Sequence, residues 1–257
     1  MNSFTNEEMA ALEERYRFTK QAASSSLSIQ TADLLEDQRL YAYLIQVKEK
    51  IEAANTTVAA SLFIKRYSFA VLIALYSMSS LNKKLDFSFK NVCIETLNEA
   101  DTLWLPSFRF NDLSVEKASS LNRSKWREEI VQQVFSGHVD VLFTHLKKHS
   151  KLSKLIMWEN LYTYIRWMYQ NLLDDPERST HHDLITEDFH YIVKEGTSSL
   201  FGSYHQNPFF RYEDQKELIE KDGKLIQKRK TCCLSYLAGS KGKHCSICPI
   251  VCKRSPT

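Results

Sequence analysis

The sequence predicts a mainly α fold with a small β component (α+β), in which a helical body precedes a small C-terminal cysteine module. Long stretches repeat apolar residues at intervals of three and four, the spacing of one face of a helix. Two short stretches instead alternate in polarity and are rich in aromatic and β-branched residues, as strands are. Five of the six cysteines lie in the last 26 residues. We therefore expect a body over residues 1–215 and a module over residues 216–257.

Five helices are predicted, because the apolar periodicity is sustained with few breakers. The 257 residues include only six Gly and five Pro, and 43% of the chain is hydrophobic, so it can bury a core of its own. Thr31 or Asp33 is expected to cap the second helix, and Asn122 or Ser124 the fourth. The predicted helices are Thr5 to Lys20, Thr31 to Ala53, Thr57 to Ser79, Lys125 to His149 and Lys151 to Leu173.

The most apolar run of the chain lies between Ala59 and Met78. Lys65 and Arg66 interrupt it and leave about a dozen uninterrupted residues, fewer than the roughly 20 that span a bilayer. We expect a buried core helix. Charged side chains in such a helix must be paired or face a cavity, so Lys65 and Arg66 are candidate site residues.

Strands are predicted for Asp86 to Thr96 and for Leu103 to Phe110. A hairpin is predicted around Asp222-Gly223, since this pair accepts the positive φ angles of a tight turn. Its second strand would lead directly into Cys232. The loop from Ala238 to Gly242 would then bring the remaining cysteines back.

The C-terminal cysteines have the spacing of a thiolate metal site. A vicinal pair, Cys232-Cys233, is followed after eleven residues by Cys245-x-x-Cys248-Pro. Structural zinc sites usually combine two Cys-x-x-Cys knuckles. Adjacent cysteines in an extended segment point to opposite sides, so they meet a larger object such as a [2Fe–2S] cluster more readily than one tetrahedral ion. The spacing favours the cluster and leaves zinc open.

A disulfide framework is the remaining interpretation of these cysteines, and it needs an oxidising compartment. The N-terminal residues show no basic segment followed by an apolar stretch, as a secretory signal would have. We therefore expect a reduced, cytoplasmic chain.

The net charge of +3 conceals an asymmetry. From Lys221 to Thr257 there are nine Lys or Arg and one acid, a charge of +8, whereas the preceding 25 basic and 30 acidic residues give −5. The run Lys228-Arg229-Lys230 is either a solvated face or positive charge that stabilises a reduced cluster and attracts anionic partners. Nucleic acid is not an expected partner, because interleaved aromatic residues and a helix-turn-helix pattern are both missing.

Four features of the chain occur together. The ending Thr-Cys-Cys followed by Cys-x-x-Cys is the most specific of them. The others are the apolar helix Ser61 to Ser80, the Trp-x-Asn motif at Trp158-Glu159-Asn160 and the Asn-Pro-x-x-Arg motif at Asn207 to Arg211. In this combination the chain resembles the FhuF-like ferric siderophore reductases. The resemblance covers most of the chain after about residue 55. Two features depart from it: the cysteine spacing is eleven residues where ten are expected, and Cys252 is an additional thiol, interpreted as a bystander.

The resemblance implies a cytoplasmic enzyme that reduces siderophore-bound Fe(III) to Fe(II), one electron at a time. Its [2Fe–2S] cluster would be held by Cys232, Cys233, Cys245 and Cys248. The electron donor would be external, such as a ferredoxin or a flavin/nicotinamide reductase system, because the sequence has no nucleotide-binding fingerprint. Association with a membrane would be peripheral at most. A zinc-stapled interaction module and an iron–sulfur redox sensor without turnover are the alternatives.

Residues that bind the substrate are expected to be cationic or amide groups near the cluster. Arg211 is the first candidate, because it belongs to the Asn-Pro-x-x-Arg motif and precedes the cysteine hairpin. The other candidates are Lys65, Arg66, Trp158, Asn160, His205 and Asn207.

Overall fold

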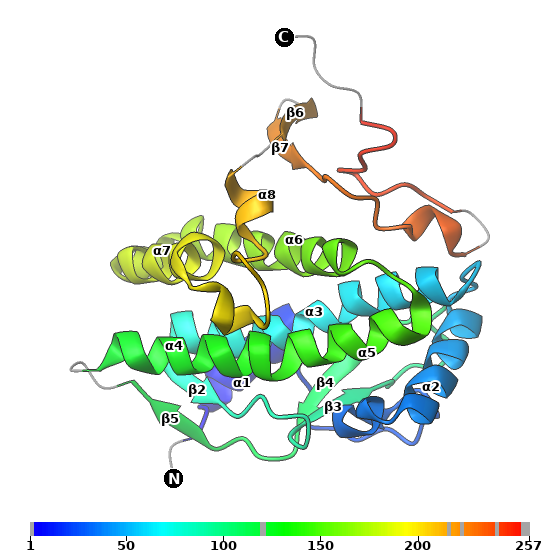
Figure 1. Cartoon of the computed structure of the whole chain (residues 1–257). Helices are drawn as coiled ribbons and strands as arrows, with labels where there is room; N and C mark the ends of the chain where they lie inside the picture. The colour runs from blue at the N-terminus through cyan, green and yellow to red at the C-terminus, as the bar shows by residue number, and fades with distance from the viewer. Residues whose placement is uncertain (1–2, 119–121, 215–216, 222–223, 240–241, 253–257) are drawn as a thin grey trace.

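The computed structural model describes residues 3–118, 122–214, 217–221, 224–239 and 242–252. It confirms the α+β class (Figure 1). The helices are α1 (Asn6–Tyr16), α2 (Asp37–Lys50), α3 (Thr56–Leu81), α4 (Arg123–Val134), α5 (Asp140–Ser150), α6 (Lys154–Leu173), α7 (His182–His190) and α8 (Phe210–Asp214). Short 3₁₀ turns lie at Thr31–Leu35, Pro176–His181, Ser198–Phe201 and Ser235–Leu237, and π-helical turns at Phe135–Val139 and Tyr191–Glu195.

Helix α3 is the centre of the fold, and the other helices pack around it (Figure 1). It begins where the Asn55 side chain accepts a hydrogen bond from the N–H of Val58, and it ends at Asn82 in the left-handed conformation. Between these caps nearly every side chain is buried. The helix is long and apolar enough to cross a membrane, with a mean hydropathy of 1.7 over its most apolar window, but 89% of that window is buried inside the protein. Helix α3 is therefore a buried core helix, as predicted.

Within the described residues, three small antiparallel sheets accompany the helices. The first has the order β1 (Ile29–Gln30), β3 (Val92–Glu95), β4 (Ser107–Phe110), with Cys93 opposite Arg109. The other two are strand pairs, β2 (Lys83–Leu85) with β5 (Val115–Lys117), and β6 (Glu217–Lys221) with β7 (Lys224–Lys228). The predicted C-terminal hairpin is therefore present as paired strands, whereas its turn, Asp222-Gly223, lies outside the described residues.

Some predicted boundaries are wrong, each for a local reason. The first helix stops at Tyr16, because Arg17 turns left-handed and the chain then passes beside Phe108. The second begins at Asp37, because Thr31 caps nothing and instead donates its hydroxyl hydrogen bond to the carbonyls of Phe89 and Val92. The helix predicted for residues 125–149 is continuous but contains a π-helical turn.

Helix and strand ends differ elsewhere as well. Lys151 is left-handed and Ser153 caps α6, so that helix begins three residues later than predicted. Asn122 precedes α4 without a side-chain capping bond. The strand predicted from Asp86 is paired only over Val92–Glu95.

The C-terminal segment lies against the helical body (Figure 1). Ala238 forms a β-bridge with Ala53, and Ala54 donates a backbone hydrogen bond to the carbonyl of Leu237 (2.9 Å). The turn Ser235–Leu237 also packs on α3. The segment thus contacts the start of α3, although the division at residues 215–216 stays a prediction.

A buried histidine, His138, lies in the π-helical turn Phe135–Val139. His138 is 1% exposed and stacks on Phe89, with ring centroids 3.8 Å apart. Its Nδ1–H donates to the carbonyl of Phe87 (2.8 Å), so Nε2 must accept the hydrogen bond from the hydroxyl of Tyr67. Burial lowers the pKa of His138 to about 3, against an ordinary value of 6.5.

The stability of the protein should therefore fall in acid in a way that depends on His138. Below about pH 6.5 the unfolded chain binds a proton at this residue and the folded chain does not, so the free energy of unfolding decreases by up to about 1.4 kcal/mol per pH unit. The measurement is urea unfolding from pH 7 to pH 4. In His138→Gln the free energy of unfolding should fall less steeply as the pH is lowered, by the contribution of about one bound proton.

His205→Gln is the matched control, because His205 is exposed. Its acid slope should remain that of the unchanged protein. Equal slopes for the protein and for His138→Gln would contradict the assignment of a neutral buried imidazole.

Candidate metal centre and adjoining pocket

The four cysteines Cys232, Cys233, Cys245 and Cys248 come together as two pairs of thiols. The Cys233 and Cys245 sulfurs lie 3.7 Å apart. Cys232 lies close enough to Cys248 for the two thiols to influence each other electrostatically. The adjacent cysteines therefore turn to different partners, as expected for a vicinal pair.

The loop that carries Cys245 and Cys248 is fixed to the end of β7. The N–H of Cys248 donates to the carbonyl of Cys245 (3.1 Å), which closes the Cys-x-x-Cys turn. The N–H of Arg229 donates to the carbonyl of Ile247 (3.0 Å). The thiol of Cys252 instead contacts the carbonyl of Ser246 (3.5 Å). Backbone hydrogen bonds thus hold the two cysteine segments side by side.

The electrostatics of this cluster favour a thiolate at Cys233. The hydrogen bond shared with Cys245 is the main cause that lowers the pKa of Cys233; burial opposes the effect, and the positive charges of Lys65 and Arg229 support it. The pKa of Cys245 is raised, because its proton is held by the Cys233 sulfur. Burial also raises the pKa of Cys232. Lys65 Nζ lies 3.7 Å from the Cys233 sulfur.

The thiol spacing fits metal–sulfur chemistry. Two thiolates on one tetrahedral ion, with metal–sulfur bonds of about 2.3 Å, lie roughly 3.8 Å apart. The Cys233–Cys245 separation of 3.7 Å matches this distance. Within the described part of the chain, no three His, Cys, Asp or Glu side chains are grouped so that they could hold a metal ion.

A buried carboxylate on α6 orients the segment that leads into the cysteines. Glu159 is 3% exposed and accepts hydrogen bonds from the N–H of Lys230 (2.5 Å) and from the N–H (2.7 Å) and the hydroxyl of Thr231. Its charge is balanced by Arg229, also 3% exposed, whose Nη2 lies 3.6 Å from Glu159 Oε2. The segment immediately before Cys232 is therefore bound to the helical body.

A second buried contact joins the same segment to α3. Asn160 accepts a hydrogen bond from Arg229 Nη2 (2.7 Å) and donates to the carbonyl and the hydroxyl of Ser61 (both 3.0 Å). The Ser61 hydroxyl donates in turn to the carbonyl of Cys233 (2.8 Å). The Trp-x-Asn motif thus has a positioning role: it fixes the backbone that carries the vicinal cysteines.

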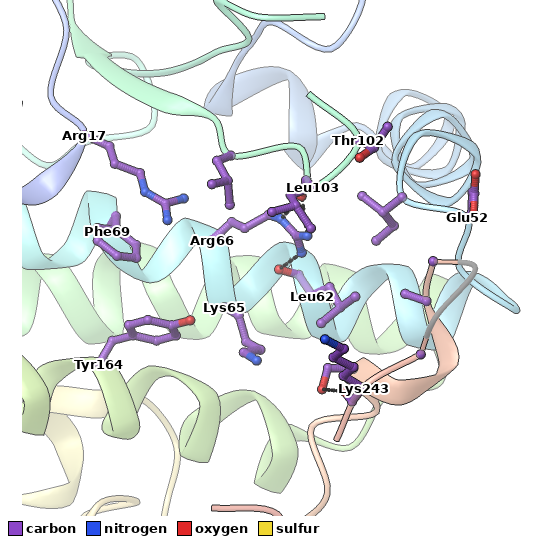
Figure 2. Close-up of a pocket in the computed structure, with 16 residues that line it drawn as sticks. Arg17, Glu52, Leu62, Lys65, Arg66, Phe69, Thr102, Leu103, Tyr164 and Lys243 are labelled. Atoms are coloured by element: carbon purple, nitrogen blue, oxygen red, sulfur yellow. Dashed lines mark hydrogen bonds between the residues drawn. The ribbon is translucent and has the colours of Figure 1, made fainter. Parts of the chain in front are cut away.

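A cavity of about 540 Å³ opens beside the thiols (Figure 2). Its walls come from the residue after α1, from α3, from the loop before β4, from α6 and from the C-terminal segment. Lys65 lines it and also contacts the Cys233 sulfur, so this side chain connects the cavity with the thiols. We call this cavity the cationic pocket, after Arg17, Lys65, Arg66 and Lys243 in its wall.

Two arginines of the cationic pocket are held without a carboxylate. Arg66 donates to the carbonyls of Leu62 (3.0 Å), Leu103 (2.5 Å) and Trp104 (2.7 Å), and burial lowers its pKa to about 10. Arg17 lies over the ring of Phe69, 4.0 Å from its centroid. Burial also lowers the pKa of Arg17.

The seven predicted substrate residues fall in four different places. Lys65 and Arg66 line the cationic pocket beside the thiols. Trp158, Asn207 and Arg211 line a separate cavity near the start of α6. In that cavity Trp158 is core, and Asn207 is bonded to the carbonyls of Ile192 (2.9 Å) and Gly196 (3.3 Å).

The two remaining candidates, Asn160 and His205, do not line the cationic pocket: Asn160 is fully buried in the network, and His205 is exposed. Sequence reasoning missed Arg17, Tyr164 and Lys243, which do line it. No local pattern marks them, because their neighbours in the pocket are distant in sequence. The interpretation of Lys228-Arg229-Lys230 as a solvated face is also wrong, since Lys228 and Arg229 are 8% and 3% exposed.

Removing the Glu159 charge should destabilise the protein and release the cysteine segment. Glu159→Gln leaves the Arg229 guanidinium buried without its counter-charge, which typically costs about 3–5 kcal/mol. The measurement is the free energy of unfolding in urea, with labelling rates of the C-terminal thiols followed by mass spectrometry. The free energy of unfolding should decrease, and Cys233 should be labelled faster than in the unchanged protein.

Glu129→Gln provides the matched control. Glu129 pairs with Lys84 at the surface (3.1 Å), and such pairs contribute at most about 1 kcal/mol. A loss of stability no larger for Glu159→Gln than for Glu129→Gln would contradict the role given to the buried carboxylate.

Comparison with known proteins assigns the larger part of the chain to a family. A family profile described as "Ferric iron reductase FhuF-like transporter" matches residues 61–219, which is more than half of the chain. The match includes α3, the Trp-x-Asn motif and the Asn-Pro-x-x-Arg motif, and it ends before the cysteines. No curated protein and no solved structure matches the chain. On the family match, the chain belongs to the FhuF-like ferric iron reductase family.

Proposed function

We propose that this protein reduces siderophore-bound Fe(III) to Fe(II), with a [2Fe–2S] cluster held by Cys232, Cys233, Cys245 and Cys248. The family assignment supports ferric-iron reduction. The observation that carries the proposal further is that Lys65 lines the cationic pocket and also contacts the sulfur of Cys233, which is paired with the sulfur of Cys245. A chelate in this pocket would lie next to the thiols.

The residues around the thiols suit a bound iron–sulfur centre. When bound, a [2Fe–2S] cluster supplies one-electron chemistry without a proton-transfer dyad. Arg229 and Lys65 provide positive charge on the protein side of Cys233, which favours its thiolate. Burial of Cys233 and Cys248, each 1% exposed, excludes water from part of the site. The electron would come from an external donor such as a ferredoxin or a flavin/nicotinamide reductase system. Because oxygen ligands bind Fe(II) more weakly than Fe(III), the reduced iron would be released from the siderophore in the cytoplasm.

Single Cys→Ser variants test the ligand set. Cys232→Ser, Cys233→Ser, Cys245→Ser and Cys248→Ser should each abolish or strongly alter the visible spectrum and the EPR signal of the dithionite-reduced, anaerobically purified protein. Cys252→Ser and Cys93→Ser are the controls, because the Cys252 thiol contacts Ser246 and Cys93 lies in β3. An unchanged spectrum after any of the first four substitutions would falsify the ligand assignment.

Metal analysis of the same sample separates this function from its two alternatives. Two irons and two sulfides per chain are expected. One zinc and no colour would identify a zinc-stapled interaction module, since zinc is redox-silent. A cluster that fails to reduce ferric chelates would identify a redox sensor.

The charge of Lys65 should raise the reduction potential of the bound centre. Its Nζ lies 3.7 Å from the Cys233 sulfur, and a positive charge at this range stabilises the reduced state. In Lys65→Gln the midpoint potential should fall by on the order of 50 mV, measured by EPR-monitored redox titration. Lys65→Arg keeps the charge and is the matched control, so a fall of the same size in both variants would show that charge is not the cause.

A further inference from the structure

The cationic pocket has an unusual balance of charge. Arg17, Lys65, Arg66 and Lys243 line it, and Glu52 is the single acidic side chain among the described lining residues. Figure 2 shows Arg17 beside Phe69, Lys65 beside Tyr164, and Arg66 directed toward Leu103. The pocket therefore presents positive charge that its own wall does not balance.

None of these four cations forms an ion pair with a carboxylate in the part of the chain that the structure describes; Asp101 acts on Arg17 and Arg66 through its charge alone. Arg66 is bonded only to backbone carbonyls, and Lys65 contacts the Cys233 sulfur. Arg17 Nη1 is buried and has no hydrogen-bond partner among the described residues. An unsatisfied charged donor of this kind typically costs a few kcal/mol, and an anionic ligand would remove that cost.

Contrast with other buried or half-buried arginines of the same protein supports a binding role. Arg123 forms a two-pronged pair with Asp188 (2.8 and 2.7 Å), and Arg229 faces Glu159. Arginines that stabilise this fold thus have carboxylate partners. Arg17 and Arg66 differ from them, and both lie at the cationic pocket.

The shape of the cationic pocket suits a chelate-sized ligand. Its volume of about 540 Å³ lies in the range of small-molecule sites. Phe69 and Tyr164 give it aromatic walls, and Phe69 also supports the plane of Arg17. A planar guanidinium held in this way presents paired N–H donors that match the two oxygens of a carboxylate.

We propose that the cationic pocket selects ferric chelates of net negative charge whose outer surface carries carboxylates, over neutral hydroxamate chelates. This inference rests on the proposed function, since it names the substrate class of the same site. Arg17 is the specificity-determining residue: its unpartnered donors bind a peripheral carboxylate, while Lys65 lies between the chelate and the thiols. A neutral chelate leaves Arg17 and Arg66 uncompensated.

Gallium(III) complexes test binding separately from reduction, because gallium(III) has the charge of iron(III) and is not reduced. The probes are gallium citrate, which is anionic, and a neutral gallium trihydroxamate. Their dissociation constants are measured by isothermal titration calorimetry on the anaerobically purified full chain. Gallium citrate should bind more tightly. Arg17→Gln should weaken its binding roughly tenfold or more and leave the trihydroxamate within about twofold.

Two further variants make the test specific. Arg17→Lys keeps the charge but not the paired donors, so it should recover only part of the affinity for gallium citrate. Arg15→Gln is the matched control, because Arg15 pairs with Asp175 (3.8 Å) and does not line the pocket; its affinities should be unchanged. Lys243 belongs to a different segment of the chain, and Lys243→Gln should also weaken the binding of gallium citrate. This variant provides the test if Arg17→Gln does not fold.

The outcomes distinguish this inference from the proposed function. Equal binding of both probes, or equal losses for both in Arg17→Gln and Lys243→Gln, would overturn the selectivity for anionic chelates. Selective binding of gallium citrate without turnover of ferric citrate would support the pocket and overturn the reductase. Turnover of ferric trihydroxamate together with no binding of gallium citrate would support the reductase and overturn the selectivity.

Discussion

The buried pairing of Glu159 with Arg229 is the interaction on which the arrangement of the site depends. A carboxylate this far from water must be compensated, and here one guanidinium and three donors from residues 230 and 231 do so. Those donors belong to the residues directly before Cys232. The requirement to satisfy one charge on α6 therefore fixes the path of the backbone into the cysteine pair.

The same network connects the thiols to the centre of the fold. Asn160 bonds to Arg229 and to Ser61, and Ser61 bonds to the carbonyl of Cys233. One turn further along α3, Lys65 reaches the Cys233 sulfur and the cationic pocket. Most of the surface of helix α3 is thus buried in the hydrophobic core. Near its first turns, the same helix forms part of the wall of the site. The thiols and the pocket keep a fixed relation because both are built on this one helix.

Sequence alone predicts what is local in this protein. The periodicity of α3, the strands around Asp222-Gly223 and the pairing tendency of Cys232 and Cys233 all follow from neighbouring residues. The role of Arg229 does not, because its partner lies 70 positions earlier, and a Lys-Arg-Lys run has the composition of a solvated face. Thr31 was misplaced for the same reason: its hydrogen bonds go to Phe89 and Val92, about 60 residues away. Arg17 and Lys243 enter the cationic pocket only through tertiary contacts.

The positively charged side chains discussed above therefore form two groups, which differ in the kind of partner that each side chain has and not in its position in the sequence. Arg123 and Arg229 face carboxylates and stabilise the folded state. Arg17, Arg66 and Lys65 lie around one cavity, and the described residues offer them carbonyls, an aromatic ring and a sulfur instead. A fold that places Arg17 and Arg66 at one cavity without an ion pair gives up stability at that point, because both guanidinium groups are partly desolvated. A ligand that carries its own negative charge restores the balance, and it does so beside the thiols.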